Sequence, residues 1–123
     1  MAKKILFIED EPDQRTIVEV RLRTAGYDVI TACDGEEGLA KARLARPDLI
    51  LLDIVIPKHD GLEVCAILKG DSGTKKIPII MLTAYGVNRV EEKSFAAGAD
   101  DCISKPYEPQ ELLQKIKSLL GKQ

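Results

Sequence analysis

Short apolar runs alternate with amphipathic helical patterns along this chain, and no other feature of the sequence constrains the fold as strongly. The runs predict five strands, at Lys4 to Glu9, Tyr27 to Ala32, Asp48 to Asp53, Ile77 to Thr83 and Asp101 to Lys105. Between them apolar residues recur at helical spacing, as Val18 and Leu22 do. Residues that end helices precede the later strands, at Ala25-Gly26, Arg46-Pro47, Asp71-Ser72-Gly73 and Ala97-Gly98.

Strict alternation of strands and helices predicts a parallel sheet with helices on both faces, because right-handed crossovers leave few other topologies. We therefore expect an α/β, doubly wound (βα)5 three-layer sandwich. In such folds ligands bind outside the carboxyl ends of the strands, where the strand order reverses. Asp10, Asp53, Thr83 and Lys105 all fall at those ends, and we expect three acids, Glu9, Asp10 and Asp53, to converge with Lys105.

Length and composition limit the class of protein. We expect one domain over residues 1–123 without an effector domain, because no repeat or linker-like tract divides the chain. The net charge of -2, with scattered basic residues, gives no basic stripe, so direct nucleic-acid binding is not expected. No apolar stretch approaches the roughly 20 residues of a bilayer span, and the N-terminus lacks the apolar region of a signal peptide. These features predict a cytoplasmic protein without a membrane role.

The cysteines and the single histidine are not expected to carry chemistry. Cys33, Cys65 and Cys102 are odd in number and lack metal-ligand spacing, so we expect buried, reduced thiols. His59 lies in a polar segment and is expected to be a solvated loop residue.

Three acids at the predicted strand ends, Glu9, Asp10 and Asp53, indicate a metal site. Carboxylates a few ångströms apart repel by about 4 kcal/mol per close pair at an effective dielectric of about 20, so they require a cation or a shifted pKa. Hard oxygen ligands without a nearby His or Cys favour Mg²⁺, or Mn²⁺, over zinc or copper. Because Mg²⁺ usually combines one or two carboxylates with water and phosphate oxygens, we expect the site to act on a phosphoryl group.

Asp53 is the candidate nucleophile of that site. Lys105 and the Thr83 hydroxyl would contact the phosphoryl oxygens, which leaves one carboxylate to attack phosphorus. Carboxylates that form aspartyl phosphates are an established class of covalent catalyst.

Four motifs together give the chain a resemblance to the receiver domains of two-component response regulators. They are Ile8-Glu9-Asp10-Glu11-Pro12, Leu52-Asp53-Ile54-Val55-Ile56-Pro57 with Asp60-Gly61, Leu82-Thr83-Ala84 and Ser104-Lys105-Pro106. Each alone would be weak, whereas their order and separations together are specific. The resemblance runs end to end and implies a stand-alone, single-domain receiver with the flavodoxin-like strand order 2-1-3-4-5.

The resemblance also implies roles for the acids. Asp53 would accept a phosphoryl group from a phosphohistidine on a histidine kinase or a histidine phosphotransfer protein. Asp10 and Asp53 would bind Mg²⁺ directly and Glu9 through water, and the backbone carbonyl of Val55 would complete the protein ligands.

The remaining site residues would hold the transferred group. By the same resemblance, Thr83, the backbone amide of Ala84 and Lys105 would contact the phosphoryl oxygens. Lys105-Pro106 resembles the family's cis peptide, and X-Pro bonds are where the cis form is least costly.

The chain departs from the family pattern at the switch residue, an aromatic three positions before the lysine, where it has Cys102. The family's output surface, built from the fourth helix, fifth strand and fifth helix, is expected to bind a downstream partner. Without the aromatic, switching could run through the loop from Ala84 to Val90, through Tyr85 or through Tyr107, and the sequence does not choose among them.

A second departure concerns dephosphorylation. Val55 and Tyr85 occupy the positions that flank the path of the hydrolytic water in the family, and neither offers a carboxylate or amide to orient it. We therefore predict slow autodephosphorylation.

Three functions compete on this sequence. The favoured one is a signalling module that changes partner binding or passes the phosphoryl group on, and that is not an enzyme beyond assisting its own phosphorylation and dephosphorylation. The alternative is a Mg²⁺-dependent phosphohydrolase with an aspartyl nucleophile, although such sites usually place an acid where this chain has Val55. A flavodoxin-like flavin carrier is the third, but Glu9-Asp10-Glu11 would repel the flavin phosphate.

Overall fold

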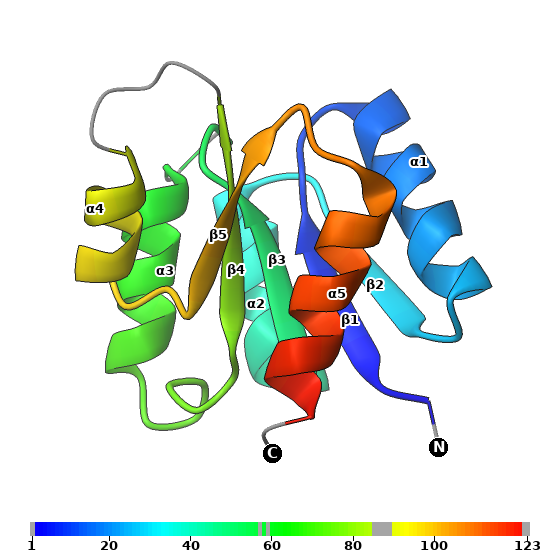
Figure 1. Ribbon diagram of the computed structural model, residues 1–123. Coiled ribbons are helices and arrows are strands. Elements are labelled where there is room, and N and C mark those ends of the chain that lie inside the picture. Colours follow the sequence, from blue (N-terminus) through cyan, green and yellow to red (C-terminus); the bar gives the residue numbers. More distant parts are fainter. Residues whose placement is uncertain (1, 57, 59, 85–89, 122–123) are drawn as a thin grey trace.

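Five parallel strands form a single sheet in the order β2-β1-β3-β4-β5 (Figure 1). The architecture comes from a computed structural model that describes residues 2–56, 58, 60–84 and 90–121. The strands are β1 (Lys4–Ile8), β2 (Asp28–Ala32), β3 (Leu49–Asp53), β4 (Ile79–Ala84) and β5 (Asp101–Lys105). The predicted strands are confirmed to within two residues at each end, and the predicted strand order is confirmed.

Helices cover both faces of the sheet (Figure 1). They are α1 (Pro12–Thr24), α2 (Gly35–Ala45), α3 (Gly61–Gly70), α4 (Val90–Ala96) and α5 (Pro109–Leu120). α1 and α5 pack on one face, whereas α2, α3 and α4 lie on the other. This is the doubly wound, three-layer arrangement that the alternation of strands and helices predicts.

Burial on both faces explains why the sequences of the central strands are continuous apolar runs. Side chains in a strand point alternately to opposite faces, so Leu6 and Ile50 enter the core under α2 and α3, while Phe7 and Leu51 enter the core under α1 and α5. All four are fully buried. A parallel strand with helices on both faces has no solvent face and therefore no polar alternation.

Acidic caps begin three of the helices at the edge of the sheet where the strands end. Glu11 accepts hydrogen bonds from the backbone amides of Asp13 and Gln14, and Asp34 accepts one from Glu37. Asp60 accepts one from the amide of Glu63 at 2.8 Å. These caps satisfy amides that have no partner within the helix, and they place the first turns of α1, α2 and α3 around the carboxyl ends of the strands.

The expectation of three buried thiols is wrong for Cys33. Cys65 is buried and Cys102 is partly buried, but Cys33 is exposed. Cys33 lies one residue beyond β2, just before the cap of α2, so the chain has already left the sheet at this position. His59 and Tyr85 lie outside the described residues.

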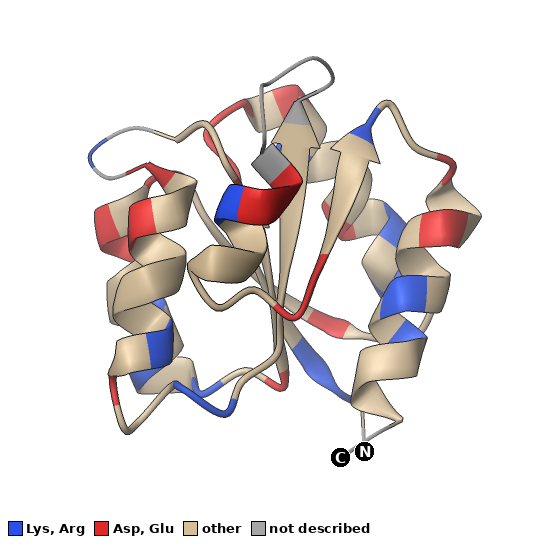
Figure 2. Cartoon of the chain, turned by 60° about the vertical axis from the view of Figure 1, so that its left-hand side comes forward, with Lys and Arg blue, Asp and Glu red and all other residues tan. Residues whose placement is uncertain are grey.

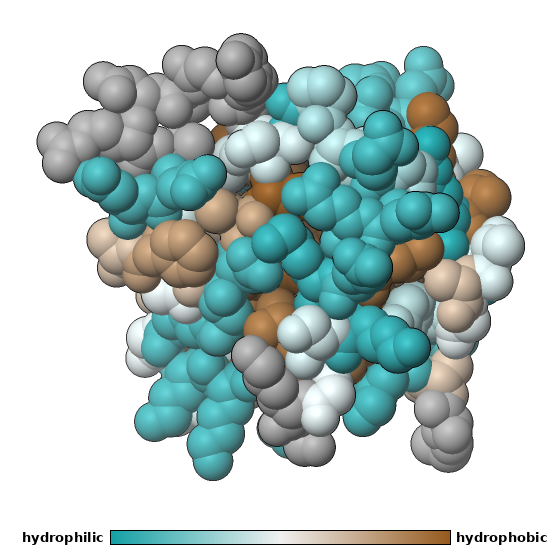
Figure 3. All heavy atoms as spheres, viewed as in Figure 1, coloured by the Kyte–Doolittle hydropathy of each residue, from teal (hydrophilic) through white to brown (hydrophobic). Residues whose placement is uncertain are grey.

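The surface is mostly polar in the view of Figure 3, where hydrophilic residues cover much of α5. None of the helices in the described part of the chain combines the length and apolar character needed to cross a bilayer.

Candidate functional site

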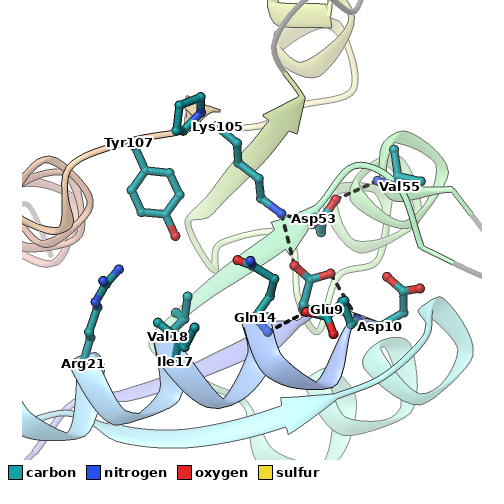
Figure 4. Close-up of a pocket in the computed structure, with 12 residues that line it drawn as sticks. Glu9, Asp10, Gln14, Ile17, Val18, Arg21, Asp53, Val55, Lys105 and Tyr107 are labelled. Carbon is teal, nitrogen blue, oxygen red and sulfur yellow. Dashed lines mark hydrogen bonds and ion pairs between the residues drawn. The ribbon is translucent and has the colours of Figure 1, made fainter.

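The carboxyl ends of β1, β3 and β5 bring Glu9, Asp53 and Lys105 together (Figure 4). Lys105 Nζ lies 2.5 Å from Asp53 Oδ2 and 3.1 Å from Glu9 Oε1. Because β4 lies between β3 and β5, the lysine side chain extends past the end of β4 to reach both acids. Three of the four side chains predicted to converge are therefore found together.

Burial makes the negative charges of Glu9 and Asp53 costly unless they are paired with a cation. Glu9 is 3% exposed and Asp53 is 6% exposed, so two carboxylates share one ammonium group away from bulk water. Burial and the neighbouring Asp53 carboxylate raise the pKa of Glu9 to about 7, although Lys105 opposes the shift. Burial by itself lowers the pKa of Lys105, but Asp53 and Glu9 outweigh it and the net shift is upward. The lysine therefore stays charged at neutral pH, while Glu9 is close to taking up a proton.

Asp10 lines the same cavity but is exposed. Among the residues that the structure describes, no three acidic, histidine or cysteine side chains are close enough to form a ready-made metal cluster. The Lys105 ammonium lies between Glu9 and Asp53, where it balances part of their charge.

The donor chemistry still suits a hard divalent cation. The described residues that line the cavity offer carboxylate oxygens from Glu9, Asp10 and Asp53, with no His or Cys among them. Such oxygen donors select Mg²⁺ or Mn²⁺, and a divalent ion would remove the charge imbalance that otherwise favours a proton on Glu9.

Asp53 is also held by the turn that follows it. The backbone amide of Val55 donates a hydrogen bond to Asp53 Oδ1 at 2.9 Å, and the Val55 side chain is exposed. The amide of Gly61 donates to the carbonyl of Ile54 at 2.8 Å. A Cβ at position 61 would lie 2.5 Å from the carbonyl oxygen of Asp53, which explains why the motif needs glycine there.

Thr83 is fully buried, and its hydroxyl is directed toward β5. The hydroxyl donates to the carbonyl of Ile103 at 3.3 Å and lies 3.4 Å from Ser104 Oγ. To contact a phosphoryl group on Asp53, the Thr83 side chain would have to rotate away from these partners. Ala84 is the last residue of β4, where it is in register with Lys105.

The peptide bond between Lys105 and Pro106 is cis, as the resemblance implied. Tyr107 follows it and is half-buried. Burial raises the pKa of its phenol, and Figure 4 shows the ring directed toward α1 and Arg21.

The sequence did not single out the part of the site that α1 provides. A cavity of about 630 Å³ runs from the acids past Gln14, Ile17 and Val18 to Arg21 (Figure 4). Positions 14, 17, 18 and 21 share one face of a helix, and this spacing was the available signal. Ile17 is 46% exposed, so the cavity has an apolar wall that a partner can reach.

A parallel sheet of this order, with a buried aspartate beside a lysine at its carboxyl edge, defines a receiver domain. The chain belongs to the response regulator receiver domain family, whose sequence model matches residues 5–117. The resemblance drawn from the four motifs is thereby confirmed, and the chain is a signalling domain of two-component systems.

Individual relatives agree with this assignment. The chain is 44% identical over 117 residues to the DNA-binding dual master transcriptional regulator RpaA of Synechocystis, and the matched region covers 95% of this chain and 48% of RpaA. It is 44% identical over 120 residues to the alkaline phosphatase synthesis transcriptional regulatory protein PhoP of Bacillus subtilis, covering 98% of this chain and 49% of PhoP. The chain thus spans about half the length of these relatives. Since RpaA is described as DNA-binding, the expectation that this chain does not bind nucleic acid stays a prediction.

A solved structure shares the fold closely. The receiver domain of the sensor histidine kinase PA1611 from Pseudomonas aeruginosa superposes with a TM-score of 0.91 at 31% identity, covering 98% of this chain and 99% of that one. That protein was crystallised with magnesium coordinated in its active-site cleft.

Proposed function

We propose that this chain accepts a phosphoryl group on Asp53 from a phosphohistidine of a histidine kinase or histidine phosphotransfer protein, in a Mg²⁺-dependent reaction. The observation that carries the proposal is the buried Asp53 carboxylate, held beside the Lys105 ammonium at the end of an open cavity. Phosphoryl transfer depends mainly on positioning and charge stabilisation, and these two residues supply both.

In the transfer, an oxygen of Asp53 attacks phosphorus while the bond between phosphorus and the partner's imidazole nitrogen breaks. The P–N electron pair stays on the imidazole, which leaves as a neutral ring because its other nitrogen carries a proton taken up from water, and Asp53 becomes an acyl phosphate. Lys105 stabilises the charge on the phosphoryl oxygens, joined by the Ala84 amide and by the Thr83 hydroxyl after it rotates from β5.

The acids would hold the metal. Asp10, Asp53 and the Val55 carbonyl would bind Mg²⁺ directly, and Glu9 would do so through water. The bound ion would neutralise charge on the acids and on the transferred group. A bound metal ion would also offset the negative charge that favours a proton on Glu9.

The open side of the cavity is where we expect the phosphodonor to approach. Ile17 of α1 and Pro106 beyond β5 line this side. An apolar wall beside a reactive group can exclude water while the partner's imidazole is in place. Ile17 and Pro106 would therefore contact the partner rather than the phosphoryl group.

We propose that the phosphorylated chain signals by changing how the surface formed by α4, β5 and α5 binds a downstream protein, or by passing the phosphoryl group on. Thr83 contacts β5 directly in the present state, so its rotation would alter contacts under that surface. Cys102 on β5 is partly buried and too small to act as an aromatic gate.

The phosphohydrolase is not favoured. Val55, two residues beyond Asp53, has an exposed aliphatic side chain and cannot act as a general acid or base. A flavin carrier is disfavoured because Glu9, Asp10 and Glu11 line the cavity and would repel a phosphate.

The proposal is tested by intact-mass measurement after incubation with acetyl phosphate, with and without Mg²⁺. The wild type is expected to gain a single phosphoryl group only with Mg²⁺, and Asp53→Asn is expected to gain none. Asp28→Asn, at the opposite end of the sheet, is the matched control and should behave as wild type. Absence of an adduct in folded wild-type protein would refute the proposal, and sustained turnover of p-nitrophenyl phosphate would favour the hydrolase.

A further inference from the structure

A second hollow, of about 520 Å³, opens on the surface formed by α4, β5 and α5. Phe95 of α4 and Cys102 of β5 contribute to its lining, as does Lys115 of α5. Figure 2 shows β5 between α4 and α5. This hollow is separate from the cavity at Asp53, although Pro106 borders both.

The hollow lies where the family's aromatic switch residue would stand. An aromatic side chain buries roughly 150–250 Å², whereas Cys102 is small and only partly buried. Phe95 beside it is 49% exposed, and Figure 3 shows apolar residues over α4 next to the hydrophilic residues of α5. An unfilled volume next to an exposed aromatic ring suits an aromatic side chain of another molecule.

The charge around the hollow indicates what should flank that side chain. Glu91, Asp101 and Glu111 line it, against the single cation Lys115 among the described lining residues. Lys115 is already paired with Asp101, at 3.2 Å from both carboxylate oxygens. Burial and then Glu91 and Asp101 raise the pKa of the Cys102 thiol, as expected where the local potential is negative. A basic partner complements the negative charge of this surface. A second copy of the chain docked through the same face would instead bring acidic residues against acidic residues.

The hollow also contacts the site through one side chain. Ser104 lines it, and Ser104 Oγ lies 3.4 Å from the Thr83 hydroxyl. Rotation of Thr83 toward a phosphoryl group would break this contact. Phosphorylation of Asp53 could thereby change the hollow without an aromatic gate.

We propose that the hollow receives an aromatic side chain from a basic segment of a downstream partner protein, so that the partner supplies the aromatic group that Cys102 does not. The inference rests on the proposed function in that phosphorylation would regulate this binding. The binding itself needs no phosphoryl group and can be measured separately.

The test follows backbone amide shifts by NMR while the chain is titrated with three synthetic peptides. One is rich in Lys and Arg around a single Trp, the second has Ala in place of Trp, and the third keeps Trp but has Glu in place of every basic residue. The first peptide is expected to shift amides at Phe95, Cys102 and Ser104, and to bind about tenfold more tightly than either of the others.

Two variants of the chain make the test specific. Cys102→Phe should fill the hollow and remove the advantage of the Trp peptide over the Ala peptide. Glu111→Lys should weaken binding of both basic peptides, whereas Glu36→Lys, an exposed change on α2, should leave the advantage of Trp unchanged.

Equal binding of the Trp and Ala peptides would overturn the proposal, as would unchanged binding to Cys102→Phe. Amide shifts confined to the Asp53 cavity, or self-association of the chain through this face in sedimentation experiments, would also overturn it. Phosphorylation of Cys102→Phe by acetyl phosphate, measured in parallel, is expected to persist. This control distinguishes a loss of peptide binding at the hollow from a loss of phosphorylation at Asp53.

Discussion

Replacing Glu9 by glutamine is expected to remove a pH dependence of stability that the metal-free protein carries. The pKa of Glu9 rises from 4.5 to about 7 in the folded state because of burial and the nearby Asp53 carboxylate. Between these pH values the folded protein holds a proton that the unfolded chain has released. The free energy of unfolding should therefore fall as pH rises through this interval.

The magnitude follows from the same interval. At 1.36 kcal/mol for each pH unit, the Glu9 contribution amounts to at most about 3 kcal/mol between pH 4.5 and pH 7. This value is an upper bound, because Lys105 opposes the shift and Glu9, although only 3% exposed, lines a cavity open to solvent. Lys105 stays protonated in both states over this range, since its pKa is raised above 10.5.

The assay is urea unfolding in the presence of EDTA from pH 4.5 to pH 8, for wild type, Glu9→Gln and the exposed control Glu36→Gln. Slopes from groups outside the cluster are common to the three proteins, so the difference between wild type and Glu9→Gln reports on Glu9 and the two side chains coupled to it, Asp53 and Lys105. Added Mg²⁺ should flatten the wild-type profile, because metal and proton compete for the same carboxylates. Identical profiles for wild type and Glu9→Gln without Mg²⁺ would refute the reasoning.

Three further changes test the core, the turn after Asp53 and the lifetime of the acyl phosphate. Leu51→Ala removes a fully buried side chain from the central sheet and should lower the free energy of unfolding by about 3 kcal/mol in urea titrations; a loss below about 1 kcal/mol would contradict the packing described. Gly61→Ala places a Cβ 2.5 Å from the Asp53 carbonyl oxygen, so it should lower the free energy of unfolding by about 2 kcal/mol and slow phosphorylation by acetyl phosphate. A variant with the stability and the phosphorylation rate of the wild type would contradict this expectation. Val55→Asn combined with Tyr85→Glu should accelerate loss of the phosphoryl group about tenfold, or about 1.4 kcal/mol of barrier, measured as adduct decay by intact mass, and no change would show that these positions do not govern the water.

The sheet and the ends of its strands could be predicted because they depend on local pattern. Apolar runs such as Leu49 to Leu52 can be buried on both faces only in a parallel sheet between helices, and each run ends where its residue types change. Asp53 and Lys105 were therefore assigned to one edge from sequence alone. The boundaries moved by at most two residues because hydrogen bonding, not composition, decides the last residue of a strand.

The sequence was less informative about residues just outside the elements. Cys33 directly follows the apolar end of a predicted strand, yet it is exposed because it lies past the end of β2. The wall of the cavity formed by Ile17 and Arg21 was also missed, since a partly exposed helix face becomes a site only when another segment lies opposite it. Here that segment is Pro106 and Tyr107, which lie far from α1 in the sequence.

By itself, the sequence determined the fold and the family, and it supplied the candidate residues for phosphoryl transfer, because these follow from residue type and order. Only the tertiary structure decided how those side chains are paired. It places the Lys105 ammonium between Glu9 and Asp53, directs the Thr83 hydroxyl toward β5, and leaves a hollow over Cys102. Such pairings depend on ångström-scale distances between segments remote in sequence, where burial and Coulomb interactions set protonation and contact, and no local pattern encodes them.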